Sequence, residues 1–253
     1  MTDQVTKAKT FKDLHVPGRP IILFNAWDAG SAKAVAASGA KAVATGSWSV
    51  AAAHGFDDGE HMPFDLAIAN LERIVAATHL PVTVDLESGY GADPEAVGAT
   101  IGRAVQAGAI GYNIEDGFRE ATLREVSDQA ARLKGAKAAA DRFGVPAFLN
   151  ARTDVFLIAS ADQHESLAAA ALERARAYAD AGADGFFVPG LADERLIARV
   201  VEGSPLPVNI MAGARTPSAA RLAELGVARI SHGPGPYRMA MKALEDAARA
   251  ALL

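Results

Sequence analysis

The chain has 253 residues, of which 50% are hydrophobic and 22% are charged, and its formal net charge is −5. This apolar fraction is enough to bury a core and excludes a disordered protein, while the negative charge excludes a dedicated nucleic-acid binder. No apolar run reaches the roughly 18 residues of a membrane-spanning helix, and the segment 1–15 is too polar for a secretion signal, so we expect a cytoplasmic protein without a membrane partner.

Two short patterns alternate along the chain and predict strands. In the first, a helix end and a glycine precede an apolar run, and this pattern occupies 37–46, 107–116, 181–190 and 225–233. Glycine is the expected left-handed stop of a helix. In the second, a proline precedes an apolar run, and this pattern occupies 20–28, 80–87, 145–154 and 206–213. Proline is tolerated at the first residue of a strand, where a missing N–H costs little.

Together the two patterns predict eight strands, near 21–25, 41–46, 82–86, 110–114, 146–151, 184–188, 207–211 and 228–232. Alanine-rich segments with helical apolar spacing lie between them, for example 163–181 and 236–251. The strands are apolar runs rather than strict alternations, which indicates parallel strands that are covered on both faces.

Eight strands that alternate with helices in about 250 residues are typical of a (β/α)8 barrel. A doubly wound open sheet usually has fewer strands, and its glycine-rich phosphate-binding fingerprint does not follow the first strand here. No linker-like or low-complexity stretch divides the chain. We therefore expect a TIM-type barrel that forms a single domain over residues 1–253, with a short N-terminal helix.

The active site of such a barrel lies at the carboxyl ends of the strands, and acids dominate these positions. Asp85 and Glu87 end the third predicted strand, and Glu115 ends the fourth. Converging carboxylates repel one another unless a cation lies among them. Oxygen ligands in a chain without cysteine favour Mg²⁺ or Mn²⁺. The spacing of Asp85 and Glu87 predicts side chains on one strand face, although acids at a strand end can also be solvated loop residues.

Other strand ends offer groups suited to an anionic substrate. Arg152 suits the capture of a carboxylate or phosphonate, or else forms a structural salt bridge with a neighbouring acid. Gly46 and Ser47 open a loop whose backbone N–H groups suit an oxyanion, while a Gly-Ser pair is also a common turn. Trp48 fits a substrate lid or a loop plug, and His232 fits a proton donor or a structural hydrogen-bonding group.

The segment 117–124 follows the fourth strand and is short and polar. It lies where a mobile active-site loop would lie in a barrel, and its glycine offers a hinge. A plain connection between the strand and the next helix is equally compatible with this segment.

Four motifs in register resemble those of the isocitrate lyase / phosphoenolpyruvate mutase superfamily. They are TGS at 45–47 followed by GFDDGE at 55–60, TVDLESGYG at 83–91, NIEDG at 113–117 and NARTD at 150–154. Their order and spacing match over about residues 10–245. The resemblance implies a Mg²⁺-dependent barrel that acts on small 2-oxo or 2-hydroxy acids through an enolate, which the ion would stabilise as a Lewis acid.

The resemblance also implies roles for single residues. Asp85 and Glu87 match a metal-binding D-x-D motif, and Glu115 matches an acid that binds the metal through water. Asp58 matches an acid of the metal shell or one that assists a nucleophile. We expect the catalytic residues to be Asp58, Glu115, Arg152 and His232. We expect the substrate to contact Thr45, Gly46, Ser47, Trp48, Arg152 and Asn209.

Two departures from the superfamily narrow the expected reaction. The isocitrate and methylisocitrate lyases carry a cysteine-containing loop after the fourth strand, but residues 115–128 contain no Cys, Lys or His, which excludes a thiol mechanism. Glu87 replaces the usual Asp and lengthens the side chain by one methylene. A lyase or decarboxylase of a small 2-oxo or 2-hydroxy (di)carboxylic acid fits best, with water or His232 as the proton donor.

Two alternatives remain open at this point. The first is hydrolysis or rearrangement of a C–P bond, as in phosphonopyruvate hydrolase and phosphoenolpyruvate mutase, for which Asp58 would be important. The second is a protein that binds a 2-oxo acid without turnover. The resemblance also implies an oligomer, often with an exchanged C-terminal helix. Little chain follows the last predicted helix, so we expect a homodimer or homotetramer formed through helix faces.

Overall fold

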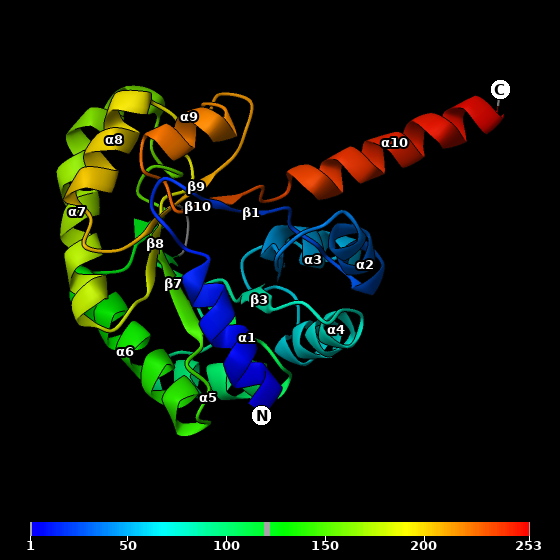
Figure 1. Cartoon of the computed structure of the whole chain (residues 1–253), viewed down its shortest axis with the longest axis horizontal. Helices are drawn as coiled ribbons and strands as arrows, with labels where there is room; N and C mark the ends of the chain where they lie inside the picture. Colours follow the sequence, from blue (N-terminus) through cyan, green and yellow to red (C-terminus); the bar gives the residue numbers. More distant parts are fainter. Residues whose placement is uncertain (1, 119–121, 253) are drawn as a thin grey trace.

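The computed structural model describes residues 2–118 and 122–252, and its centre is a nearly closed barrel (Figure 1). All eight predicted strands are present and parallel, and they pair in the order β1-β10-β9-β8-β7-β4-β3-β2. Their bounds are β1 Ile21–Leu23, β2 Val43–Ala44, β3 Val82–Asp85, β4 Gly111–Glu115, β7 Phe148–Arg152, β8 Gly185–Phe187, β9 Val208–Met211 and β10 Arg229–Ser231. The predicted (β/α)8 fold is confirmed.

The barrel closes between its first two strands by a short contact. Ala26 and Thr45 form an isolated parallel bridge just beyond β1 and β2, and the backbone N–H of Ala26 donates to the carbonyl of Ala44 over 2.8 Å. Closure brings the carboxyl ends of all these strands to one mouth. Residues distant in sequence therefore meet there.

Helices alternate with the strands, and most of them cover the outside of the barrel (Figure 1). Their bounds are α1 Thr2–Asp13, α2 Ala29–Ala37, α3 Ser47–Ala53, α4 Phe64–Ala76, α5 Pro94–Gln106, α6 Val126–Arg142, η1 Ala161–Gln163, α7 His164–Asp180, α8 Glu194–Gly203, α9 Ala219–Glu224 and α10 Gly235–Leu252. The glycine of each predicted helix stop has a positive φ, in the order Gly39, Gly108, Gly182 and Gly226. Glycine is favoured there because it has no Cβ to clash in the left-handed region.

The segment after β4 forms a small hairpin around residues that lie outside the described part of the chain. Strand β5 (Gly117–Phe118) pairs antiparallel with β6 (Thr122–Leu123). The predicted loop over 117–124 is therefore described only at its two ends. Neither its mobility nor its role as a hinge is tested.

Helix α1 closes the end of the barrel where the strands begin. The ring of Phe11 lies 5.6 Å from that of Phe148, the first residue of β7, and His15 stacks on Phe148 at 4.0 Å. Lys12 binds Asp184, between α7 and β8, at 2.7 Å. This confirms the predicted N-terminal helix and explains its polar sequence, since only one face of α1 contacts the barrel.

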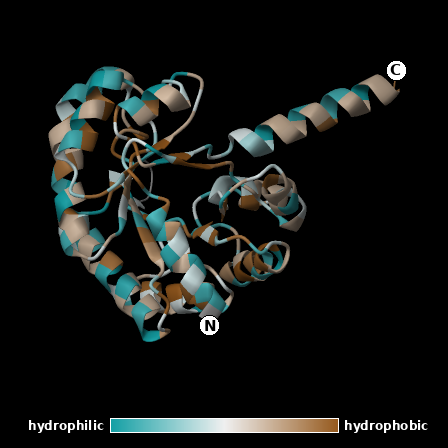
Figure 2. Ribbon diagram, in the orientation of Figure 1, coloured by the Kyte–Doolittle hydropathy of each residue, from teal (hydrophilic) through white to brown (hydrophobic). Residues whose placement is uncertain are grey.

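Helix α10 confirms the predicted helix over 236–251, but it does not lie on the barrel. It projects away from the other elements and ends far from them (Figure 1). Pro236 is its one buried residue among those described. Both hydrophobic and hydrophilic residues alternate along its length (Figure 2). No helix in the described part of the chain is long and apolar enough to cross a membrane.

We expect His15 to make the fold sensitive to acid. Burial, together with the charge of Arg229, lowers the pKa of His15 to about 3, against about 6.5 in the unfolded chain. A lowered folded-state pKa gives stability that is present above pH 6.5 and is lost as the pH falls towards 3. The free energy of unfolding in urea should fall by about 3 kcal/mol more in the wild type than in His15→Gln between pH 7.5 and pH 4.

His79 provides the control, because it is an exposed histidine on the same barrel. The variant His79→Gln should keep the acid dependence of the wild type. Equal acid dependence of the wild type and His15→Gln would contradict this assignment.

Candidate active site

A cavity of about 210 Å³ opens at the carboxyl ends of the strands. Six of the predicted site residues line it: Gly46, Ser47, Trp48, Asp58, Asp85 and Arg152. Leu157, Phe187, Met211 and Pro234 make much of the remaining wall apolar. Five predicted residues are not among those that line the cavity: Thr45, Glu87, Glu115, Asn209 and His232. The structure thus brings the centre of the predicted site together and places the other residues around it.

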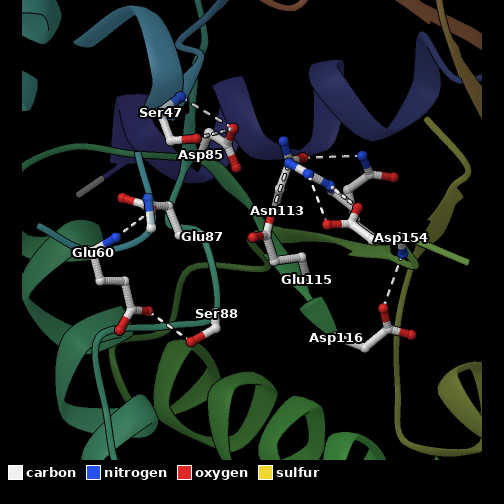
Figure 3. A network of polar contacts seen from close by, with 12 residues as sticks. Ser47, Glu60, Asp85, Glu87, Ser88, Asn113, Glu115, Asp116 and Asp154 are labelled. Atoms are coloured by element: carbon white, nitrogen blue, oxygen red, sulfur yellow. Dashed lines mark hydrogen bonds and ion pairs between the residues drawn. The ribbon is translucent and has the colours of Figure 1, made fainter. Parts of the chain in front are cut away.

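Asp85, the last residue of β3, presents one carboxylate oxygen without a protein partner. Its Oδ2 accepts hydrogen bonds from the backbone N–H and the hydroxyl of Ser47, over 3.1 and 3.0 Å (Figure 3). Its backbone N–H donates to Oγ1 of Thr45 over 3.0 Å. Its Oδ1 is buried and has no hydrogen-bond partner among the described residues. Ser47 and Thr45 therefore orient a carboxylate whose free oxygen suits a cation.

Arg152, the last residue of β7, binds two acids at once. Its Nη1 lies 2.6 Å from Oε2 of Glu115, and its Nε and Nη2 donate to the two oxygens of Asp154 over 2.6 and 2.9 Å. Burial raises the pKa values of Glu115 and Asp154, and repulsion from neighbouring carboxylates adds to the rise, which Arg152 opposes. Arg152 thus forms structural salt bridges with neighbouring acids and also lines the cavity, while its capture of a substrate stays a prediction.

Glu87 does not share a strand face with Asp85, so the expectation from their spacing is wrong. Strand β3 ends at Asp85, and Glu87 has a φ of 52°, in the left-handed region. Its Oε2 accepts from the backbone N–H groups of Gly59 and Glu60, and its Oε1 accepts from the hydroxyl of Tyr90 over 2.7 Å. Burial raises the pKa of Glu87 to about 7. Hydrogen bonds from the protein thus engage both of its oxygens.

Asp58 reaches the cavity from the connection between α3 and α4. The residue lies on an exposed turn, but its carboxyl is directed towards the acidic mouth of the barrel. Partial burial raises the pKa of this carboxyl, and the charge of Asp85 raises it further. A carboxyl group with a raised pKa is suited to hold a proton near a substrate.

His232 and Asn209 lie beside the cavity rather than in its wall. Nδ1 of His232 is 3.4 Å from the carbonyl oxygen of Leu23, and its ring packs on Phe24. Asn209 is buried and donates from Nδ2 to the hydroxyl of Ser231 over 3.1 Å. Ser231 itself lines the cavity. Asn209 therefore reaches the cavity wall only through Ser231, and its predicted direct contact with the substrate stays untested.

The predicted site residues do not include three polar residues of the cavity wall, namely Asn25, Asn113 and Ser231. Asn113 lies two positions before Glu115 on β4, and Ser231 ends β10. Alternation along the strand could have indicated Asn113, because residues two apart point to the same side, but not Ser231, which directly precedes the predicted His232. Oδ1 of Asn25 accepts from the backbone N–H groups of His232 and Gly233 over 2.9 and 3.0 Å, a contact that no sequence pattern indicated.

Arg229 lies inside the barrel below these residues. It is fully buried, and its Nε and Nη2 lie 3.3 and 3.4 Å from Oγ of Ser231 and Oδ1 of Asn113. Burial lowers its pKa to about 9, so it remains charged at neutral pH. A positive charge therefore lies beneath a cavity whose mouth is acidic, and it favours anions there.

The donor set fits a hard divalent cation held by few protein groups. The carboxyl groups of Asp58, Asp85 and Glu115 converge here, the pKa values of Asp58 and Glu115 are raised by burial and by neighbouring carboxylates, and Oδ1 of Asp85 lacks a partner among the described residues. The described residues contain no group of three or more His, Cys, Asp or Glu arranged to hold a metal ion. Mg²⁺ usually binds to one or two carboxylates and fills its other positions with water and substrate, so the free oxygen of Asp85 is the group that suits it.

Comparisons with known proteins agree with this geometry. The profile of a family described as "Phosphoenolpyruvate phosphomutase" matches residues 11–252. An uncharacterized protein of Mycobacterium tuberculosis is 38% identical over 242 residues, which are 95% of this chain and 88% of that protein. The oxaloacetate decarboxylase of Pseudomonas fluorescens is 31% identical over 183 residues, which are 70% of this chain and 61% of the enzyme.

A solved structure covers almost the whole chain. It is a provisionally named phosphonomutase from Burkholderia cenocepacia, with 57% sequence identity and a TM-score of 0.96 over 98% of this chain and 99% of that one. The resemblance inferred from the four motifs is confirmed by this structure and by the family profile.

We expect the two acids bound by Arg152 to make that residue important for stability. In Arg152→Met, Glu115 and Asp154 would stay buried without a cation, which should lower the free energy of unfolding by about 3 kcal/mol at pH 7.5 in EDTA. The folded-state pKa values of these acids would rise further above their unfolded values. Protonation then relieves the repulsion, so the loss should shrink towards pH 4.5. Urea unfolding at both pH values measures it.

Arg221 is the matched control, because it also binds two acids, Glu194 and Glu224, but on an exposed surface. Arg221→Met should leave the free energy of unfolding close to that of the wild type, because an exposed salt bridge contributes little to stability. Equal effects of the two substitutions, or a loss in Arg152→Met that does not depend on pH, would argue against the assignment.

Proposed function

Because the chain belongs to the phosphoenolpyruvate phosphomutase family, we propose that it is a Mg²⁺-dependent lyase or decarboxylase. Its substrate would be a small 2-oxo or 2-hydroxy (di)carboxylic acid, cleaved through an enolate. The main support is the free, buried oxygen of Asp85 beside Arg152 in a cavity of about 210 Å³. The likeness to an oxaloacetate decarboxylase favours the same class of reaction.

Asp85 would hold Mg²⁺, or Mn²⁺ in its place, through Oδ1, while Ser47 keeps Oδ2 occupied. Glu115 would lie in the next layer, because Arg152 already binds its carboxylate. The bound ion would supply a Lewis acid that polarises the oxo group of the substrate and favours negative charge on its oxygen.

The chain's own residues would bind the acid and keep the cavity dry. Arg152 retains N–H groups beyond those that face Glu115 and Asp154, since a guanidinium has five donors, and these suit the carboxylate of the substrate. Phe187 and Met211 form an apolar wall that limits the size of the acid and excludes water.

Cleavage would leave an electron pair on the substrate, which must then take up a proton. Asp58 suits this step better than His232, because Asp58 lines the cavity and its pKa is raised, whereas the ring of His232 packs on Phe24. Water remains an alternative proton source. No thiol is needed, which agrees with the absence of cysteine.

The second candidate is C–P bond chemistry on a phosphonate such as phosphonopyruvate. The similarity to the provisionally named phosphonomutase favours it, as does the position of Asp58 in the cavity wall. Hydrolysis of the C–P bond would release inorganic phosphate, and its rearrangement would convert phosphonopyruvate to phosphoenolpyruvate, whereas a lyase would release CO₂ or an aldehyde. A protein that binds a 2-oxo acid without turnover would form none of these products.

Turnover should depend on Mg²⁺ and on Asp85. We expect the wild type to convert oxaloacetate, or another small acid of a 2-oxo and 2-hydroxy panel, in Mg²⁺ but not in EDTA. Asp85→Asn should lower kcat/KM at least 100-fold, since it removes the charge that would hold the ion. Coupled detection of pyruvate and CO₂ measures the reaction, and phosphate detection with phosphonopyruvate runs in parallel.

Asp57→Asn is the control for this experiment. Asp57 is exposed and precedes Asp58 on the same loop, but it is not among the residues that line the cavity. Its rate should equal that of the wild type. Turnover that persists in EDTA or in Asp85→Asn would contradict the proposal, and binding of 2-oxo acids without any product would favour the non-catalytic alternative.

We also propose that the protein is a homodimer or homotetramer in which copies exchange α10. The outer face of β1 and the neighbouring part of α2 leave an open groove of about 380 Å³, where Ile22 and Phe24 are 48% and 38% exposed. In a (β/α)8 barrel, the helix after the last strand normally covers this region. Here that helix points away (Figure 1).

Helix α10 of a second copy would present an apolar side to this groove. Its apolar residues recur at helical spacing on one side: Tyr237, Met241, Leu244, Ala248 and Leu252. Arg19 and Lys41 line the groove, and Glu245 and Asp246 lie on the helix.

A cytoplasmic location stays a prediction from the sequence.

Substitutions on α10 should therefore change the oligomeric state. By light scattering, the wild type should be a dimer or tetramer, and Met241→Glu/Leu244→Glu should be smaller because two charges would enter an apolar contact. Lys242→Gln, an exposed position outside the apolar side of the same helix, should keep the mass of the wild type. A monomeric wild type, or a double variant with unchanged mass, would contradict helix exchange.

A further inference from the structure

Two loops beside the cavity are joined by hydrogen bonds in which each loop donates to a glutamate carboxylate of the other. We name residues 55–61 the Asp58 loop and residues 86–92 the Ser88 loop. Glu87 of the Ser88 loop accepts hydrogen bonds from the backbone of Gly59 and Glu60 in the Asp58 loop. Glu60 in turn accepts from the hydroxyl of Ser88 and the backbone N–H of Tyr90, each over 2.7 Å (Figure 3). Each loop thus binds the acid of the other.

The backbone of both loops is held in an unfavourable conformation. Glu60, Glu87 and Tyr90 have φ values of 63°, 52° and 48°, and no other non-glycine residue in the described part of the chain has a positive φ. Side chains with a Cβ disfavour this region, so contacts around them must compensate. The reciprocal hydrogen bonds of Glu60 and Glu87 provide that compensation at the same residues.

The Ser88 loop is the fixed side of this contact. Arg132 of α6 is fully buried, and its guanidinium donates to the backbone carbonyls of Ser88, Gly91 and Ala92 over 3.0, 2.7 and 3.2 Å. At the tip of the Asp58 loop, by contrast, residues 57–59 are exposed. Glu87 therefore connects a loop bound by the buried Arg132 to a more exposed one.

The residue held by this contact is next to Asp58. Gly59, whose N–H binds Glu87 over 2.7 Å, directly follows Asp58, whose side chain lines the cavity. Glu87 itself does not line the cavity, and the donors of the two loops engage both of its oxygens. The longer side chain of Glu reaches these donors, whereas an Asp would be one methylene shorter.

We propose that Glu87 is a positioning residue that holds the Asp58 loop at the cavity and does not bind the metal ion. This role rests on the proposed function in one respect, namely that Asp58 acts on the substrate. In this proposal Asp85, the first acid of the D-x-D motif, binds the ion, whereas Glu87, at the position of the second acid, binds the Asp58 loop. Glu60 is the matching half of the same contact.

Hydrogen–deuterium exchange of the full chain tests the contact without turnover. In Glu87→Met, which removes every acceptor, the amides of Gly59 and Glu60 should exchange at least tenfold faster than in the wild type. Glu87→Gln, which keeps one acceptor oxygen, should give a smaller increase. Glu60→Ala should also accelerate exchange in the Asp58 loop. Unchanged exchange in Glu87→Met and Glu60→Ala would overturn the proposal.

Mn²⁺ binding, followed by electron paramagnetic resonance, separates the loop role from a ligand role. The affinity of Glu87→Met should stay within twofold of the wild type, while Asp85→Asn should lose at least tenfold. A loss in Glu87→Met equal to that in Asp85→Asn would overturn the proposal. Glu60→Ala extends the same test to a residue outside the metal motif, should Glu87→Met fold poorly.

A double-mutant cycle with Asp58→Asn tests whether Glu87 acts through Asp58. If it does, Glu87→Met should slow turnover in the wild type but cause little further loss in Asp58→Asn, so the effects are non-additive. Additive effects would overturn the proposal. If the wild type itself shows no turnover, that result counts against the proposed function alone, because the hydrogen–deuterium exchange and Mn²⁺ measurements do not require turnover.

Discussion

The site depends on an imbalance of charge at the mouth of the barrel. Several carboxylates meet where the strands end, and Arg152 is already shared between Glu115 and Asp154. Burial and mutual repulsion raise the pKa values of these acids. A cation at the free oxygen of Asp85 would relieve the repulsion. Binding of an ion and stability of the site are therefore coupled.

Polar residues inside the barrel support this arrangement from below. Arg229 contacts Ser231 and Asn113, and Asn150 donates to Asn113 over 3.0 Å. These hydrogen bonds connect the side chains that form the floor of the cavity. Helix α1 closes the barrel beneath the network, where Phe11 and His15 pack on Phe148. The basic floor favours an anionic ligand in the cavity, and the acidic mouth favours a cation beside that ligand.

The sequence predicted the barrel well because its signals are local. Glycines such as Gly39 and Gly182 end helices through their own backbone freedom, and they mark the strand that follows. The positions of Asp85 and Arg152 follow from strand ends. The contacts of Glu87 could not be predicted, because they depend on where the Asp58 loop lies in space. The direction of α10 could not be predicted either, because an apolar helix face does not specify whether the helix packs on its own barrel or projects away from it.

The most direct test of the account is a crystal structure with Mn²⁺ and oxalate, read from the anomalous signal of the metal. The account predicts one Mn²⁺ in the cavity bonded to Oδ1 of Asp85, with oxalate between the ion and Arg152. Glu87 should keep its contacts with Gly59 and Glu60. A metal ion bonded to Glu87, or a cavity that holds oxalate without metal under the same conditions, would contradict it.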